Sequence, residues 1–114
     1  MKRISTHVLD IALGQPAKDM AVRLERRETS GSWVALGSAR TDANGRCEQL
    51  LPNGDALRGG LYRLSFDTAS YHHAQKVKSL YPVVEVTFQV HQEESQFHIP
   101  LLLSPHGYTT YRGT

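Results

Sequence analysis

The sequence predicts an all-β fold, a β-sandwich of antiparallel strands with one short helix. Seven or eight short segments alternate apolar and polar side chains with period 2, the pattern of strands with one buried and one solvated face. Polar turn sequences rich in Gly, Pro, Asn and Ser separate these segments at regular intervals. An antiparallel sheet with one solvated face must bury its apolar face against another element. A second sheet packed on that face is the simplest arrangement that does so.

The first half of the chain contains three predicted strands. They cover residues 4–10, 21–26 and 33–41. Val22 and Leu24 share the inward face of the second strand, because side chains alternate along a strand. The Asn44-Gly45 pair tolerates positive φ and predicts a tight hairpin that places Arg46 at the start of the returning strand.

One stretch, residues 70–79, breaks the alternation and predicts a helix of two to three turns. Ser70 is its predicted N-cap, since a serine side chain can accept a hydrogen bond from a free backbone N–H of the first turn. Pro82 lies beyond the predicted C-terminal end, where proline is common because it cannot continue a helix.

The other predicted segments of the second half are a loop and four strands. The loop covers residues 51–60, and the strands cover 61–67, 83–91 and two final segments joined through 104–107. The inward-facing residues are Tyr62, Leu64 and Phe66, then Val84, Val86, Phe88 and Val90, and finally Phe97, Ile99, Leu101 and Leu103. The same alternation turns His98 away from the core.

Length and composition narrow the class of protein. At 114 residues, with 39% hydrophobic and 21% charged residues, residues 1–114 are expected to form one globular domain. A net charge of +2, with scattered Arg and Lys, does not indicate nucleic acid or an anionic membrane as a partner. The chain has no apolar run of about 18 residues, and its patterned sequence begins at Ile4, so we expect a cytoplasmic protein.

Two histidines lie on strands, on the face opposite the main apolar set. They are His7 and His98. Each alone is typical of an ordinary surface histidine, but the first and last long strands of a sandwich can lie side by side, which would make the two neighbours on one outer face. Imidazoles placed together can move protons near pH 7. The four other histidines, at turns or in the helix, are predicted to be solvent-exposed: His72, His73, His91 and His106.

Two arginines and one cysteine are further candidates. Arg46 and Arg112 are surface charges by default, but beside two imidazoles they offer fixed donors for an anionic heterocycle. Cys47 follows Arg46, which could lower a thiol pKa, although a lone cysteine on a strand usually serves packing. As the only cysteine, it excludes an internal disulfide.

Leu9 and Leu102 are predicted on the same outer face as the two histidines. Exposed leucines beside ionisable groups favour a surface that is buried by another copy of the chain, because isologous dimers are the commonest assembly.

Several separate motifs, in order along the chain, resemble the transthyretin-like proteins. They are His7-Val-Leu-Asp10, Gly14-Gln-Pro-Ala17, Phe97-His-Ile-Pro-Leu-Leu-Leu-Ser-Pro105, Gly107-Tyr-Thr109 and Tyr111-Arg-Gly-Thr114. Within that family the chain is similar to the 5-hydroxyisourate hydrolases, because His7, Arg46 after an Asn-Gly turn, His98 and the terminal tetrapeptide match positions that the hydrolases use. It departs at His106, and at Thr114, where serine is commoner.

The resemblance implies a transthyretin-type sandwich of two four-stranded antiparallel sheets with one short helix. It implies a homotetramer, a dimer of dimers, with active sites in a channel where the dimers meet. The implied reaction of urate degradation is hydrolysis of 5-hydroxyisourate to 2-oxo-4-hydroxy-4-carboxy-5-ureidoimidazoline, with no metal or organic cofactor, because the acyl carbon is already electrophilic.

The resemblance also suggests roles for the matching residues. His7 and His98 would act as general base and partner, in either order, and Arg46 would hold the anionic substrate and stabilise the attacked carbonyl oxygen. The tetrapeptide Tyr111, Arg112, Gly113 and Thr114 would close and orient the substrate pocket.

Two other classes of protein stay open on the sequence. The first is a non-catalytic transthyretin-like carrier of small molecules, although such a carrier does not need the two histidines or the terminal tetrapeptide. The second is a structural or interaction β-sandwich whose histidines are incidental or bind a metal. Two histidines would need further ligands to hold zinc.

Overall fold

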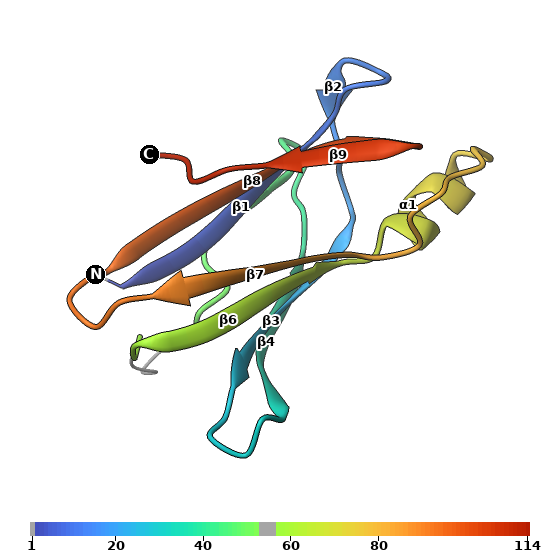
Figure 1. Ribbon diagram of the computed structural model, residues 1–114. Helices are drawn as coiled ribbons and strands as arrows, with labels where there is room; N and C mark the ends of the chain where they lie inside the picture. Colours follow the sequence, from blue (N-terminus) through green and yellow to red (C-terminus); the bar gives the residue numbers. More distant parts are fainter. Residues whose placement is uncertain (1, 53–56) are drawn as a thin grey trace.

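The computed structural model describes residues 2–52 and 57–114, which form two stacked β-sheets with one helix at an end (Figure 1). The predicted loop at residues 51–60 therefore lies partly outside the described residues. The strands are β1 (Arg3–Asp10), β2 (Gln15–Pro16), β3 (Ala21–Arg27), β4 (Trp33–Arg40), β5 (Arg46–Cys47), β6 (Gly60–Phe66), β7 (Val84–Val90), β8 (Gln96–Ser104) and β9 (Gly107–Thr110), and the helix is α1 (Thr68–Ala74).

The predicted two-sheet sandwich is confirmed, with one difference in strand number. One sheet has four strands in the order β4-β3-β6-β7. The other has the order β2-β1-β8-β9 and gains a fifth strand because β5 also pairs with β1. This sheet thus has one strand more than the four expected. Two of its strands, β2 and β5, are only two residues long and are too short to show a period-2 pattern in the sequence.

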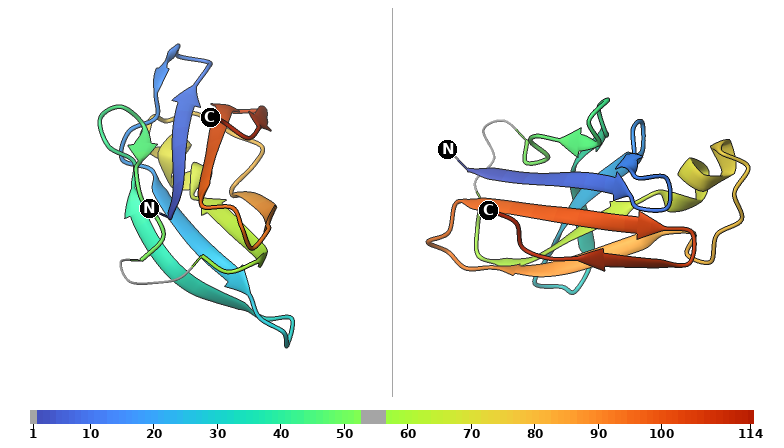
Figure 2. Two further views of the ribbon diagram at one scale, coloured as in Figure 1. Left: turned by 90° about the vertical axis from the view of Figure 1, so that its left-hand side faces the viewer. Right: turned by 90° about the horizontal axis from the view of Figure 1, so that it is seen from above.

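The antiparallel prediction is correct for every described strand pair except β1 and β8, which run parallel. Figure 2 shows the two strands side by side. Alternation identifies the face of a side chain but not the direction of a strand, and no short turn joins these two segments. The sequence pattern could therefore not have revealed the parallel pairing.

The predicted hairpin at Asn44-Gly45 is wrong in its partner. The turn forms, but the residues after it do not pair back with β4. Instead the chain crosses to the other sheet, where Cys47 pairs with Thr6 and Arg46 pairs with His7. This crossing brings an arginine from the middle of the chain to the outer edge of β1.

The alternating inward residues fill the space between the sheets. The most buried members, each at most 1% exposed, include Ile4, Val8, Val22, Leu24, Tyr62, Leu64, Phe66, Val84, Val90, Leu101 and Leu103. Burying one such large apolar side chain contributes about 1.5–3 kcal/mol, so this core fixes which face of each strand points outward. The predicted faces of these strands are confirmed.

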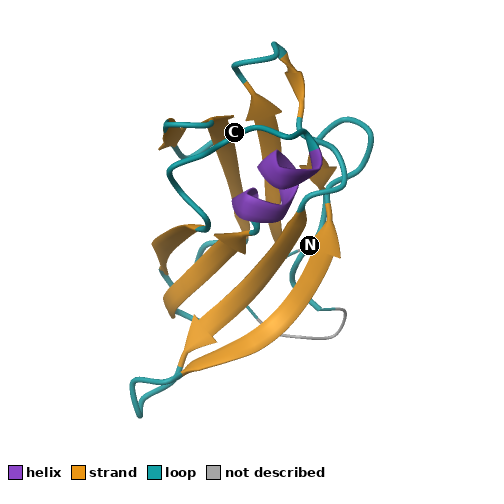
Figure 3. Ribbon diagram, turned by 90° about the vertical axis from the view of Figure 1, so that its right-hand side faces the viewer, coloured by secondary structure: helices purple, strands orange, loops and turns teal. Residues whose placement is uncertain are grey.

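Helix α1, purple in Figure 3, covers Thr68–Ala74 and so begins earlier and ends sooner than predicted. Its N-cap is Asp67, whose carboxylate accepts a hydrogen bond from the Ser70 N–H at 3.1 Å, and not Ser70 itself. It ends before Lys76, which has a left-handed φ of +58°. His72 lies on the buried face with Thr68 and Tyr71, following i, i+3, i+4 spacing.

The prediction of an exposed His72 is therefore wrong, since only 2% of the residue is exposed. His73, His91 and His106 are exposed, as predicted. No helix in residues 2–52 or 57–114 is long and apolar enough to span a membrane.

Candidate active site

The pairing of β1 with β8 brings the predicted histidines onto one outer face. Ser5 lies opposite His98, and His7 lies opposite Pro100, two residues further along β8. Because residues two apart on a strand share a face, His7 and His98 are diagonal neighbours on the surface turned away from the core. The predicted neighbourhood of the two histidines is confirmed.

A glycine turn fixes Arg46 beside His7. Asp42 accepts hydrogen bonds from the backbone N–H groups of Asn44 and Arg46, both at 2.9 Å. The bond from Arg46 holds the pKa of the Asp42 carboxyl below its usual range. Gly45 has φ of +78°, and a Cβ there would collide with the backbone carbonyl oxygen of Val8, so only glycine fits.

His7 has a defined tautomer in this arrangement. Its Nε2 lies 2.8 Å from the backbone carbonyl oxygen of Asn44. A carbonyl oxygen can only accept, so Nε2 carries the proton and donates it to this bond. In the neutral ring, Nδ1 then keeps a free lone pair.

His98 is held from two sides. Its Nδ1 lies 2.8 Å from the hydroxyl oxygen of Ser5, and its backbone carbonyl accepts a 2.7 Å hydrogen bond from the Gly113 N–H. Burial lowers the pKa of the His98 imidazole, and the nearby charges of Arg46 and His7 lower it further, while Glu48 opposes them. His98 is therefore neutral near pH 7 and able to accept a proton.

A depression of about 480 Å³ opens over His98. Its lining comprises Arg3, Ser5, Arg46, Glu48, Gln96, Phe97, His98, Arg112, Gly113 and Thr114. The C-terminal segment reaches it because the chain after β9 runs back along β8, as Figure 1 shows and as the bridge between His98 and Gly113 confirms. A Cβ on Gly113 would lie 2.6 Å from Cδ2 of His98, so the close approach requires glycine at this position.

Contacts with Glu94, Gln96 and Phe97 hold the Arg112 side chain at the rim of this depression. Its guanidinium donates to a carboxylate oxygen of Glu94 at 2.8 Å and to the backbone carbonyl of Gln96 at 3.2 Å, and it lies 4.6 Å from the centre of the Phe97 ring. The bond from Arg112 lowers the pKa of Glu94. These contacts fix where the terminal segment passes over β8.

Two predicted site residues do not line this depression: His7, which is the diagonal neighbour of His98 on the same outer face, and Tyr111. Tyr111 is 54% exposed and lies at an apolar groove that Phe88, Phe97 and Ile99 also line. Arg112 borders both surfaces, since it lines this groove as well as the depression. In the single chain Tyr111 does not pack beside a ligand at His98.

Ser5, Arg3 and Glu48 are lining residues that the sequence reasoning missed. The signal for the first two was available, because the alternation that places His7 on the outer face of β1 places Arg3 and Ser5 there as well. Glu48 could not be found this way, since β5 ends at Cys47.

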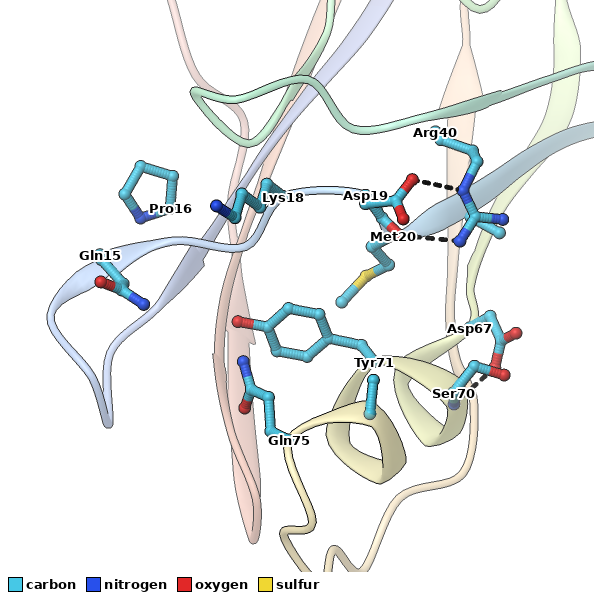
Figure 4. Close-up of a pocket in the computed structure, with 12 residues that line it drawn as sticks. Gln15, Pro16, Lys18, Asp19, Met20, Arg40, Asp67, Ser70, Tyr71 and Gln75 are labelled. Atoms are coloured by element: carbon cyan, nitrogen blue, oxygen red, sulfur yellow. Dashed lines mark hydrogen bonds and ion pairs between the residues drawn. The ribbon is translucent and has the colours of Figure 1, made fainter.

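A second depression, of about 250 Å³, lies between α1 and the segment that joins β2 to β3 (Figure 4). Met20 and the ring of Tyr71 contribute apolar surface, and at one side Arg40 is paired with Asp19 at 2.7 Å. None of the predicted site residues lines it.

Cys47, the one cysteine of the sequence, follows Arg46 in β5. Burial raises the pKa of the Cys47 thiol to about 11, so its neighbour Arg46 does not activate it. Among residues 2–52 and 57–114, no three His, Cys, Asp or Glu side chains are grouped closely enough to hold a metal ion.

Comparison with known proteins defines the class. The model of the HIUase/Transthyretin family matches residues 4–113, and the chain belongs to this family, whose sandwich it shares. A 5-hydroxyisourate hydrolase from Mus musculus is 45% identical over 112 residues, which cover 97% of this chain and 94% of the mouse protein.

Two solved structures resemble this chain over nearly its whole length. The 5-hydroxyisourate hydrolase of Klebsiella pneumoniae is 32% identical with a TM-score of 0.86, covering 100% of both chains. Sea bream transthyretin in complex with thyroxine is 31% identical with a TM-score of 0.89, covering 97% of this chain and 94% of that one. Hydrolase and hormone-binding relatives match the backbone almost equally, so the fold alone does not separate enzyme from carrier.

Proposed function

We propose that this protein hydrolyses 5-hydroxyisourate to 2-oxo-4-hydroxy-4-carboxy-5-ureidoimidazoline in the urate degradation pathway. The observation that carries the proposal is the neutral His98, which lies with His7 and Arg46 on one outer face, beside a depression that the C-terminal segment helps to line. The full-length similarity to proteins named 5-hydroxyisourate hydrolase supports the same reaction.

His98 acts as the general base in this mechanism. It takes a proton from a water molecule, whose oxygen adds to the electrophilic ring carbonyl carbon; the C–N bond then breaks, and the proton passes to the leaving nitrogen. The resulting carboxylic acid ionises and releases one proton. A positioned base of this kind contributes about 10²–10⁴-fold to the rate. The lowered pKa supports His98 in this role, because it keeps the imidazole unprotonated near pH 7.

Arg46 stabilises the negative charge that builds on the attacked carbonyl oxygen. Removing one such fixed donor typically costs about 10²–10³-fold in turnover. The Asn44 carbonyl and the Gly45 turn hold His7 next to this guanidinium, so that the second imidazole orients the water or the leaving group. Substrate binding falls to Arg112, Gly113 and Thr114 at the rim, and Tyr111 joins them only from outside the depression.

Four copies of the chain complete the site in this proposal, as a dimer of dimers. The depression is open to solvent in one chain, and apolar side chains continue the same outer face toward the far end of β1. Leu9 and Leu102 are half-buried on the same outer face, while Ile11 and Leu13, just after β1, are 56% and 55% exposed. A second copy on this face would bury them and exclude water from the reaction.

The rival function is a non-catalytic small-molecule carrier. The match to sea bream transthyretin in complex with thyroxine favours it as strongly as the fold can. The polar lining of the depression, with its arginines and His98, argues against a carrier of apolar ligands.

Generating 5-hydroxyisourate in the cuvette with urate oxidase tests the proposal. The protein is expected to accelerate the decay of the ultraviolet absorbance of the substrate, and a chelator is expected to leave the rate unchanged. Binding without accelerated decay would identify a carrier instead. We propose the cytoplasm as the site of this reaction, since the one cysteine, Cys47, is free, as is usual in a reducing compartment.

A further inference from the structure

The row of outward side chains on β1 continues beyond the residues of the proposed mechanism. Arg3 pairs with Gln96 in the same register that pairs Ser5 with His98 and His7 with Pro100. Residues two apart share a face of a strand, so Arg3, Ser5 and His7 form one row with His98 beside its middle member. Arg3 and Arg46 therefore stand toward opposite ends of the candidate site.

The backbone and side chain of Arg3 differ in how they are held. The backbone N–H donates to the carbonyl of Ser95 at 2.8 Å, which anchors the start of β1. The side chain is half-buried and lines the His98 depression, and its Nε is buried with no hydrogen-bond partner among residues 2–52 and 57–114. Arg112, by contrast, is already paired with Glu94.

The charge of the depression suits an anion. Three arginines line it, Arg3, Arg46 and Arg112, against one acidic side chain, Glu48. Arg112 is held at the rim by its ion pair with Glu94, and Arg46 lies beside His7. The guanidinium placed to meet the remaining end of a bound anion is therefore that of Arg3. A guanidinium presents several N–H donors in a planar fork that matches carbonyl and carboxylate oxygens.

We propose that Arg3 is a further substrate-binding residue, which holds the negatively charged, carbonyl-bearing end of the heterocycle that lies away from the bond being cleaved. This inference rests on the proposed function. The contact is made equally to the substrate and to the transition state, because the charge at that end does not change during ring opening. Such uniform binding lowers KM and leaves kcat unaltered.

Steady-state kinetics of Arg3→Gln and Arg3→Lys test the proposal. Arg3→Gln is expected to raise KM for 5-hydroxyisourate about fivefold to tenfold with kcat within about twofold, and Arg3→Lys to restore part of the loss. The KM of Arg3→Gln is also expected to rise less steeply with salt than that of the unaltered protein. The matched control, Arg40→Gln, removes an arginine from the second depression and should change neither constant.

Circular dichroism and the melting temperature verify that each variant is folded. An unchanged KM in folded Arg3→Gln, or a loss confined to kcat, would overturn the proposal. If the unaltered protein does not accelerate hydrolysis, the proposed function fails separately, and calorimetric titration with urate, a stable anionic oxopurine, decides the role of Arg3. Weaker urate binding by Arg3→Gln supports it, and equal binding or none by the unaltered protein contradicts it.

Discussion

His98 and Arg46 come from distant parts of the chain, yet the charge of Arg46 affects the protonation of His98. Burial is the main cause of the lowered pKa of His98, and the positive charges of Arg46 and His7 add to it. A cation beside an imidazole disfavours its protonation, because two like charges would then face each other. The same arginine that is proposed to stabilise the transition state thus also keeps the base in its active form.

Replacing Arg46 by Gln is expected to raise the pKa of His98 toward its ordinary value, since one of the charges that lower it is removed. An NMR titration of the His98 ring signals measures this directly and requires no substrate. Arg40→Gln serves as control, because Arg40 lines the other depression. A pKa of His98 that is the same with and without Arg46 would mean that the two side chains are not close.

His72 is the buried titratable group that the proposed mechanism does not use. Both of its ring nitrogens are buried without a hydrogen-bond partner within the described residues. Burial lowers its pKa, Asp10 acts in the opposite direction, and His106 lowers it slightly further. Its neighbour Tyr71 donates to the buried carboxylate of Asp10 at 2.7 Å, and burial is the main reason that the pKa of Tyr71 is raised to about 12.

Stability is therefore expected to fall as the pH drops below about 6.5, the ordinary pKa of histidine. Below this pH the unfolded chain binds a proton at His72 while the folded chain does not. The contribution of neutral His72 to the free energy of unfolding is therefore complete above about pH 6.5 and is lost as the pH falls toward the lower pKa of the folded state. Urea denaturation at pH 7 and pH 5 measures it. His72→Leu should reduce the pH dependence and His73→Gln, at an exposed neighbour, should not; equal slopes in all three proteins would contradict the assignment.

At the scale of elements, the sequence predicts faces well and partners poorly. Period-2 alternation correctly placed His7 and His98 outward, and the Asn44-Gly45 turn forms where expected. The partner of the strand after that turn could not be predicted, because β5 is only two residues long and pairs across to the other sheet. Strand direction is likewise absent from an alternating pattern, so the parallel pairing of β1 and β8 was missed.

The prediction errors at the helix and at the C-terminal tail each have a local cause. Asp67 and Ser70 are both good N-caps, and the choice of Ser70 starts the predicted helix too late. The prediction of an exposed His72 is a separate error, since it rests on the location of the residue in a short helix and not on the face of that helix. The tail motif is predicted as one functional unit, but Tyr111 lines the apolar groove and Gly113 lies against the His98 ring. The regular strand ends at Thr110, so the alternation of β9 does not determine where these later residues point.

The passage of the C-terminal segment over His98 depends on Gly113. A methyl group there would meet the His98 ring at 2.6 Å and Pro100 at 3.3 Å, so Gly113→Ala must displace the segment or the ring. We expect turnover of 5-hydroxyisourate to fall by about 10-fold to 100-fold with little change in melting temperature, because a misplacement of about 1 Å has effects of this size.

Gly107→Ala is the matched control for this prediction, since a Cβ at Gly107 meets nothing closer than 3.9 Å. Gly113→Ala with the activity of Gly107→Ala would show that the segment has no part in catalysis.

For the whole molecule, the exposed apolar residues support the proposal that several copies of the chain assemble around the site. Leu13 and Ile11 extend from the end of β1, next to the face that carries the candidate site. Their exposure is costly in water, and burying both in a contact between copies would contribute about 1.5–3 kcal/mol each. In the proposal the candidate site and the assembly are linked, because the surface that would be buried continues the face that carries His7 and His98.

Sedimentation is expected to give four times the mass of one chain. Leu13→Glu should dissociate the assembly and lower activity, since it places a charge in the contact. Val34→Glu, at a position on β4 that is 39% exposed and belongs to the other sheet, should leave both unchanged. A monomeric unaltered protein with full activity would refute the shared site.

The most direct measurement compares the turnover of His7→Ala, His98→Ala, Arg46→Gln and the double variant of the two histidines with that of the unaltered protein. If the three side chains act as one unit, each single change lowers kcat by at least about 10²-fold. The kcat of the double histidine variant is then little lower than that of the less active single histidine variant. Near-normal turnover by folded His98→Ala would contradict the mechanism.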